Sequence, residues 1–145
     1  MGVTLGRRVI KGGYVKSDNF DLGDSLSHRV DAFVGIAGAN YGLTTCYGES
    51  EFLLKTCNNK NGFYPGVMKD VGLSDYLDEM NKDGTREGDY VASILSTFDD
   101  VILFGGLVFG RYTSQWPTND DSKIFSTPEY THIHLRDETF ETQYQ

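Results

Sequence analysis

The sequence has few cysteines and prolines, a shortage of basic residues and no long apolar run. Its 145 residues include 2 Cys, 3 Pro and 13 Lys+Arg against 21 Asp+Glu, which gives a formal net charge of -8. Because a phosphate backbone is bound by a positively charged face, this balance argues against a nucleic-acid partner. The longest apolar run, residues 101–104, ends at Gly105 and is far short of the roughly 18 residues that a membrane span requires. The composition therefore predicts neither a nucleic-acid-binding protein nor a stable membrane span.

The length and the remaining composition are typical of one globular domain over residues 1–145. Hydrophobic residues make up 39% of the chain, which is enough for a core of ordinary size. Residues 1–13 contain no apolar stretch followed by a small-residue cleavage site, so they do not resemble a signal peptide.

The apolar pattern alternates between strands and helices along the chain. Gly12 and Gly13 end the first expected helix, and Ser74 is a favourable N-cap for the second. The first two expected strands are apolar at almost every position, which is typical of strands buried in a parallel sheet. We expect helices over residues 3–11, 75–81 and 137–145, and strands over residues 30–37, 90–97 and 130–135.

This order of elements predicts an α/β protein with a mostly parallel sheet. Three strands are few for an open parallel sheet, because long edges and apolar faces would stay uncovered. We therefore expect that the chain corresponds to the second half of a larger sheet, with a central strand missing.

The two cysteines lie in a long polar loop over residues 43–70. Ten residues separate Cys46 from Cys57, and a close pair in such a loop favours a local disulfide and an oxidising compartment. Two unrelated reduced thiols are the alternative. A zinc site is not expected, because zinc takes about four ligands at tight spacing.

Acidic and imidazole side chains follow the expected strands. Asp99 and Asp100 come directly after the second strand, and His132 and His134 lie in the third. Reactive residues of open α/β sheets sit beyond the carboxyl ends of strands. Asp followed by His is the chain order of the later part of a Ser…Asp…His triad, in which the imidazole activates a hydroxyl and the carboxylate orients the imidazole.

The nucleophile motif G-x-S-x-G of such a triad is absent from the sequence. Met1 and Gly2 are followed directly by the first expected helix. If the residues before Met1 were G-x-S, Met1 and Gly2 would complete the motif at a strand-to-helix turn.

The sequence resembles the class 2 lipase family over essentially all 145 residues. The resemblance rests on stretches that occur in the family's order and spacing: MGV through the Gly12–Gly13 pair, VDAFVGIAGANYG with LTTC, ILSTFDD, and THIHLRDET. It covers the C-terminal half of the family's domain. The cysteine loop with NGFYPG is similar to the nematode branch of the family.

The resemblance implies the C-terminal portion of an α/β-hydrolase fold whose central nucleophile strand is missing from this chain. Asp99, in the motif Ser96-x-x-Asp99, matches the triad acid, and His132 matches the triad base. Asp100, the neighbour of Asp99, is the rival acid. His134 stands where the family tends to have Gly and is the rival base. The nucleophilic Ser would fall just before Met1, whose backbone N–H would be an oxyanion donor.

The function implied by the resemblance is that of a secreted serine lipase or carboxylesterase in lipid catabolism. Its substrate would be a lipid or another ester, and no metal or organic cofactor is expected. The chain by itself, without the Ser, is expected to be inactive. The sequence leaves the oligomeric state open. The alternative function is a non-catalytic, secreted binding protein that keeps the lipase scaffold.

Overall fold

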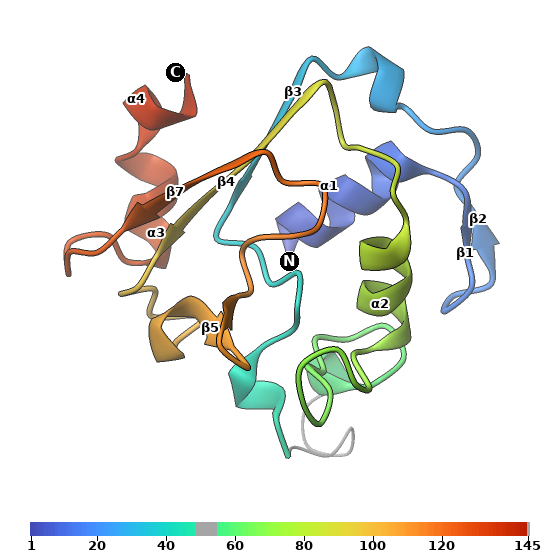
Figure 1. Cartoon of the computed structure of the whole chain (residues 1–145), viewed down its shortest axis with the longest axis horizontal. Coiled ribbons are helices and arrows are strands. Elements are labelled where there is room, and N and C mark those ends of the chain that lie inside the picture. The colour runs from blue at the N-terminus through green and yellow to red at the C-terminus, as the bar shows by residue number, and fades with distance from the viewer. Residues whose placement is uncertain (49–54, 145) are drawn as a thin grey trace.

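A parallel three-stranded sheet lies at the centre of the molecule (Figure 1). The computed structural model describes residues 1–48 and 55–144. The sheet contains β3 (Ala32–Ile36), β4 (Tyr90–Ser96) and β7 (Asp121–Phe125) in the order β3-β4-β7, and both pairings are parallel. The structure is therefore of the α/β type with a parallel sheet, as the sequence predicted.

The helices and short elements surround this sheet. The helices are α1 (Gly2–Lys11), α2 (Asp75–Lys82), α3 (His132–Asp137) and α4 (Phe140–Gln143). Two small hairpins pair β1 (Tyr14–Val15) with β2 (Phe20–Asp21), and β5 (Leu107–Val108) with β6 (Arg111–Tyr112). Single 3-10 turns are η1 (Ser27–Arg29), η2 (Thr44–Cys46), η3 (Lys55–Cys57) and η4 (Phe104–Gly106).

The first two helices and the first two strands of the prediction are confirmed. α1 ends at Gly12, whose φ of 65° is a left-handed conformation that favours glycine. Ser74 precedes α2 as the N-cap residue, but its hydroxyl donates to the carbonyl of Gly62 at 2.8 Å instead of capping the helix. Of the polar C-terminal helix, α4 covers only residues 140–143.

The predicted third strand over residues 130–135 is wrong, because this segment begins helix α3. The alternation of Ile133 and Leu135 with two histidines fits the period of a strand. In the structure these two apolar residues do not share one environment, because Leu135 is fully buried and Ile133 is exposed. The third strand is β7, which lies in a polar stretch for which the sequence predicted no element. β7 is at the edge of the described sheet, where charged residues such as Asp121 and Lys123 are common.

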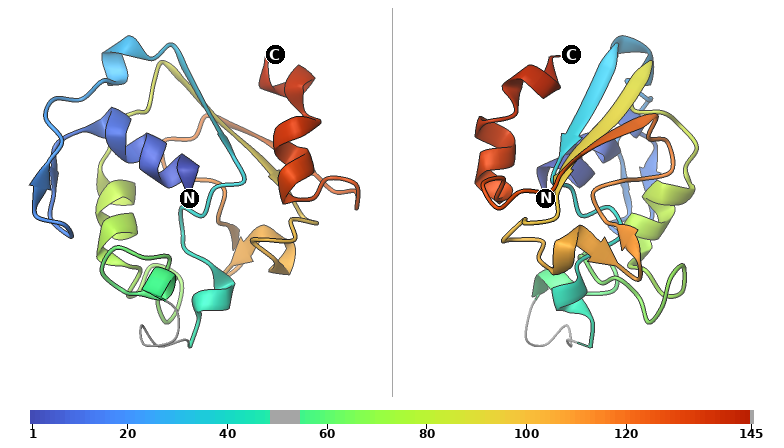
Figure 2. Two further views of the ribbon diagram at one scale, coloured as in Figure 1. Left: turned by 180° about the vertical axis from the view of Figure 1, so that it is seen from behind. Right: turned by 60° about the vertical axis from the view of Figure 1, so that its left-hand side comes forward.

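Helices cover both faces of the sheet, with α1 and α2 on one side and α3 and α4 on the other (Figure 2). Alternate residues of β3 point to these two layers. Gly35 faces α1 and must be a glycine, because a Cβ there would lie 2.7 Å from the Trp116 ring and 2.9 Å from Val3. On the other face, Val34 and Ile36 pack against the core that Leu135 of α3 completes.

Helix α1 turns its polar residues toward the protein interior. Leu5 and Val9 lie on its exposed side. The buried side chains of α1 are Thr4, Arg7, Arg8 and Lys11. This inverted arrangement requires buried partners for the charges, because an unpaired buried charge is strongly destabilising.

The buried partner of Arg7 is Glu87, which is likewise fully buried. Arg7 Nε donates to Glu87 Oε1 at 2.8 Å, and Arg7 Nη1 donates to the amide oxygens of Asn40 and Asn81 at 2.8 and 3.1 Å. The guanidinium also lies 4.9 Å from the centre of the Trp116 ring. Arg7 thereby joins α1 to α2, to the turn after β3 and to the segment before β4.

The Glu87 carboxyl is ionised despite its burial. Burial raises its pKa, but hydrogen bonds from Thr118 and Arg7, together with the nearby Arg7 and Lys11 cations, lower the pKa overall. Lys11 Nζ lies 3.4 Å from Glu87 Oε1 and donates to the carbonyl of Asp83 at 2.9 Å. The network therefore holds two cations and one anion between α1 and the chain that follows α2.

The predicted disulfide between Cys46 and Cys57 is present, with Cα atoms 5.1 Å apart. It joins η2 to η3 and restrains part of the long loop predicted over residues 43–70. Residues 49–54 of that loop lie outside the described residues. Closing a loop of this length stabilises a domain by about 3 kcal/mol in the chain-entropy description.

We predict that Arg7→Met lowers the free energy of unfolding by about 3 to 5 kcal/mol, because it leaves the buried Glu87 carboxylate without its main partner. Urea unfolding followed by circular dichroism measures the loss. Arg86→Met is the control, since Arg86 pairs with Asp120 at the surface and its removal should cost much less. Equal losses in the two variants would contradict the role given to the buried pair.

Candidate active site

Asp99 lies in the turn that directly follows β4. One carboxylate oxygen, Oδ1, accepts the backbone N–H groups of Val101 and Ile102 at 2.9 and 2.8 Å. These bonds fix the carboxylate to its own turn. The residue is only 4% exposed, and its second oxygen, Oδ2, is directed at His132.

His132 is the first residue of α3. Its ring atom Nδ1 lies 2.7 Å from Asp99 Oδ2, and its side chain is 32% exposed. Because Asp99 is a carboxylate, the Nδ1–H donates and Oδ2 accepts. This tautomer leaves Nε2, on the far side of the ring, able to accept a proton.

The surroundings of Asp99 keep its carboxyl ionised. Burial raises its pKa, but the hydrogen bond from His132 and those from the backbone of Ile102 and Val101 outweigh burial and lower the pKa overall. An ionised, buried carboxylate both orients the imidazole and stabilises its protonated form. The pair can therefore serve as an oriented general base.

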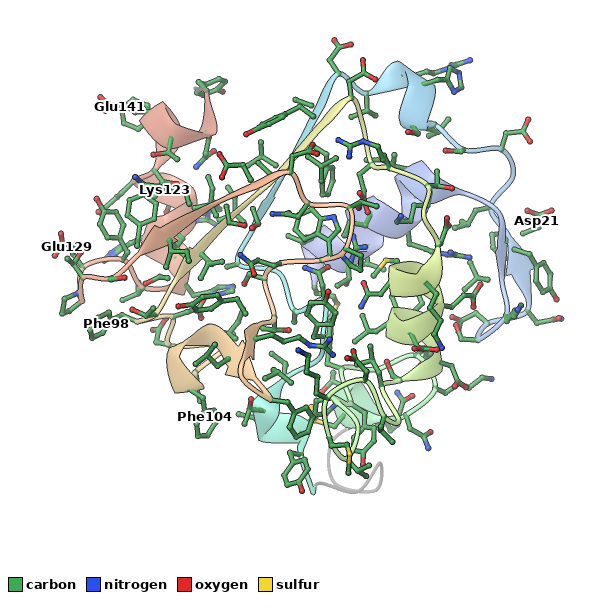
Figure 3. All side chains as sticks on the ribbon, in the orientation of Figure 1. Asp21, Phe98, Phe104, Lys123, Glu129 and Glu141 are labelled. Atoms are coloured by element: carbon green, nitrogen blue, oxygen red, sulfur yellow. A yellow bond between two sulfur atoms is a disulfide. The ribbon has the colours of Figure 1, made fainter. Side chains whose placement is uncertain are left out.

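The neighbouring rivals of this pair have other partners. His134 is 47% exposed, and its Nδ1 lies 2.6 Å from the carbonyl of Glu129, a residue at the outer edge of the molecule in Figure 3. Asp100 accepts the backbone N–H of His132 at 3.0 Å and so bonds the main chain of that residue. The structure thus brings Asp99, and neither rival, to the ring of His132.

Met1 precedes α1 at the carboxyl end of β3. A Cβ at Gly38, just after β3, would lie 2.9 Å from Val3 Cγ1, so the first turn of α1 lies against that strand end. Figures 1 and 2 both show the N-terminus beside the arrowhead of β3. Since β3 and β4 are parallel and in register, Met1 lies at the same edge of the sheet as Asp99 and His132.

A hollow of about 350 Å³ opens beside the start of α1. Its lining combines apolar and polar side chains, among them Met1, Leu5, Phe63, Asn61 and Tyr76. The Tyr76 hydroxyl donates to the carbonyl of Thr4 at 3.2 Å. The hollow offers room for a small organic group next to the Met1 backbone.

An exposed apolar turn follows Asp99. Phe98 and Phe104 project outward from the end of β4 and from the next turn (Figure 3). Leu103, Phe104 and Phe109 adopt positive φ values of 63°, 52° and 48°, which are uncommon for large side chains. Gly105 ends the apolar run of residues 101–104, and a Gly–Gly pair is typical of a turn, but no sequence pattern predicts positive φ values at leucine and phenylalanine residues.

No helix within residues 1–48 and 55–144 combines the length and the apolar character that crossing a bilayer requires. Within the same described part of the chain, no three His, Cys, Asp or Glu side chains gather as they would around a metal ion.

The fold and the site together define an α/β protein with a buried aspartate bonded to a half-buried histidine at the carboxyl edge of a parallel sheet. The family model "Lipase (class 2)" matches residues 1–145, so the chain belongs to the class 2 lipase family. The comparison with curated proteins found no match, and neither did the comparison with solved structures. Family membership indicates a hydrolase with lipase or esterase activity, and it confirms the family resemblance stated from the sequence motifs.

We predict that the stability difference between the wild type and Asp99→Asn shrinks as the pH falls below about 5. The pKa of Asp99 is lowered in the folded state, so its stabilising effect is present above the unfolded value of about 3.9 and is lost as the pH falls through the folded value. Urea unfolding of both proteins at several pH values between about 5 and 2 measures this difference. A difference that stays constant or grows on acidification would contradict the lowered pKa.

Proposed function

We propose that the protein is a serine carboxylic-ester hydrolase acting in lipid catabolism, with Asp99 as the triad acid and His132 as the triad base. The nucleophile in this proposal is a Ser that directly precedes Met1. The single observation that supports the proposal most is the 2.7 Å contact between His132 Nδ1 and the buried Oδ2 of Asp99, in a member of the class 2 lipase family.

In the proposed reaction, the Ser hydroxyl attacks the ester carbonyl while His132 Nε2 takes the hydroxyl proton. Asp99 holds the Nδ1–H of the imidazole and stabilises its positive charge. The backbone N–H of Met1, at the start of α1, donates to the carbonyl oxygen as negative charge develops there. His132 then protonates the departing alcohol, and water, deprotonated by the same imidazole, releases the acid from the acyl-enzyme.

The uncovered surfaces of β3 and α1 support an α/β-hydrolase fold with one more strand. In the described ranges β3 pairs with β4 alone, and only Gly35 of its five residues is buried. Leu5 and Val9 expose apolar surface on α1. A strand parallel to β3 that leads into α1 would cover β3 and would place the residue before Met1 at a strand-to-helix turn.

The substrate class in this proposal is an ester with an apolar acyl chain. The turn after Asp99 exposes Val101, Leu103 and Phe104 beside the Asp–His pair, and Phe104 is 62% exposed. Backbone hydrogen bonds fix this turn. The N–H of Leu103 donates to the carbonyl of Asp99 at 3.0 Å, and the N–H of Gly106 donates to the carbonyl of Leu103 at 2.9 Å. We infer that these side chains contact the acyl chain.

The proposed location is extracellular. The disulfide between Cys46 and Cys57 supports it, because disulfides persist in oxidising compartments and are rare in the cytosol.

We predict that the 145-residue chain does not hydrolyse a chromogenic ester, whereas the protein expressed from the reading frame that extends upstream of Met1 does. In the extended protein His132→Gln lowers kcat by roughly 10⁶-fold and Asp99→Asn by roughly 10⁴-fold, as in other triads. A fluorophosphonate labels the Ser before Met1 in the active protein.

His134→Gln is the matched control for this experiment, because its ring bonds the Glu129 carbonyl and should leave kcat close to the wild-type value. A residue other than Ser before Met1, or full hydrolysis by His132→Gln, would overturn the proposed function. The first of these results would instead favour a non-catalytic member of the family.

We predict that Phe104→Ser lowers kcat/KM for a long-chain ester by about fivefold, which corresponds to about 1 kcal/mol of lost apolar contact, and leaves a short-chain ester unaffected. Phe140→Ser is the control. Phe140 is also exposed, but it lies on α4. Its neighbour Glu141 is at the upper left of Figure 3, whereas Phe104 is near the lower edge. An unchanged chain-length preference in Phe104→Ser would remove the acyl-contact role.

A further inference from the structure

The main chain of His132 has an anchor separate from that of its ring. His132 begins α3, and its N-cap residue Thr131 makes no side-chain capping bond. The first N–H groups of a helix have no partner within the helix. The N–H of His132 donates to Asp100 Oδ1 at 3.0 Å, so a carboxylate 32 residues earlier in the chain takes the place of the cap.

Two consecutive carboxylates therefore hold one histidine at two points. Asp99 Oδ2 accepts the ring Nδ1–H at 2.7 Å, and Asp100 Oδ1 accepts the backbone N–H at 3.0 Å. The remaining oxygen of Asp99 is bonded to Val101 and Ile102 of the same turn. Both anchors thus come from one rigid turn at the end of β4.

Helix α3 is short, so a hydrogen bond to the main chain of its first residue adds a fixed point at its start. It has six residues, and Leu135 is the one that is buried. Ile133, next to His132, is exposed. A bond to the ring alone would leave the backbone of His132 free to shift while χ1 and χ2 compensate, and such a shift would move Nε2. A displacement of about 1 Å at a reacting atom lowers a rate by up to about a hundredfold.

We propose that Asp100 is a positioning residue that fixes the main chain of His132 and thereby aims its Nε2. This role rests on the proposed function of His132 as the triad base. Asp100 acts through His132 and touches neither the substrate nor the ring. Its side-chain oxygen is needed as a hydrogen-bond acceptor at a defined place, and its negative charge is not.

Two substitutions at this exposed position distinguish a role of the acceptor oxygen from a role of the negative charge. Asp100→Asn keeps an acceptor oxygen in place and removes the charge. Asp100→Glu keeps the charge and displaces the acceptor by one methylene group. Positioning by the hydrogen bond predicts that the Asn variant behaves like the wild type and the Glu variant does not, whereas a role of the charge predicts the reverse.

The first readout is the downfield proton NMR resonance of the His132 Nδ1–H bonded to Asp99, measured on the protein expressed from its natural reading frame. His132→Gln assigns the resonance by removing it. We expect Asp100→Glu and Asp100→Ala to broaden it or move it upfield, and Asp100→Asn to preserve it. This readout needs no ester hydrolysis, so it tests Asp100 even where the proposed catalytic function fails.

The second readout is the kinetics on a soluble short-chain ester. We expect kcat of Asp100→Glu and Asp100→Ala to fall between about tenfold and a hundredfold with KM unchanged, and kcat of Asp100→Asn to stay close to wild type. Gln143→Ala is the control for a merely structural effect, because Gln143 Nε2 donates to the carbonyl of Arg136 at the other end of α3. It should lower stability without changing the resonance or kcat.

The proposal is overturned if Asp100→Glu and Asp100→Ala keep the wild-type resonance, or if Asp100→Asn loses it as they do. A wild-type resonance in all three variants assigns Asp100 to an ordinary surface turn. Loss of the resonance in Asp100→Asn and Asp100→Ala, with a wild-type resonance in Asp100→Glu, assigns its role to charge. If the extended protein shows no hydrolysis, the proposed function fails separately, and the resonance alone decides the role of Asp100.

Discussion

One constraint arranges the whole molecule: the parallel, in-register pairing of β3, β4 and β7. Parallel ladders bring the carboxyl ends of all their strands to one edge, and each strand must leave that edge through a loop. The turn with Asp99 follows β4 there, α3 begins there after β7, and α1 starts beside the end of β3. Asp99 and His132, 33 residues apart in the sequence, meet because of this backbone geometry, and Met1 lies at the same edge of the sheet.

A second constraint is the buried charge network around Arg7 and Glu87. An ordinary amphipathic helix would pack an apolar face against the sheet, whereas α1 buries charged side chains and leaves Leu5 and Val9 exposed. Bonds from one guanidinium to Glu87, Asn40 and Asn81 have strict geometry, so they fix the direction of α1 more narrowly than apolar contacts would. The place of the helix start at the sheet edge follows from this orientation.

The candidate site depends on both constraints, because its parts come from separate elements. Asp99 accepts a backbone N–H of its own turn and is also bonded to the ring of His132. The adjacent Asp100 accepts the main-chain N–H of the same histidine. The core below the site is small: Leu135 packs with Ile94 and Ile102 between β4 and α3. Side-chain orientation at this edge therefore rests on hydrogen bonds as much as on packing.

Local patterns and motifs were sufficient to predict the family, the helices α1 and α2, the strands β3 and β4, and the cysteine pair. It also singled out Asp99 and His132. The element that holds His132 was mistaken for a strand, since alternation over five residues fits a strand and a short helix equally well. β7 was missed because an edge strand needs no apolar pattern.

The contact between the Asp99 carboxylate and the His132 ring, and the burial of Arg7, are established by the folded chain alone. These are long-range contacts, and neither side chain of such a contact carries a local signal of its partner. The free energy that fixes them comes from burial and hydrogen bonding between segments distant in sequence, which a pattern along the chain does not contain.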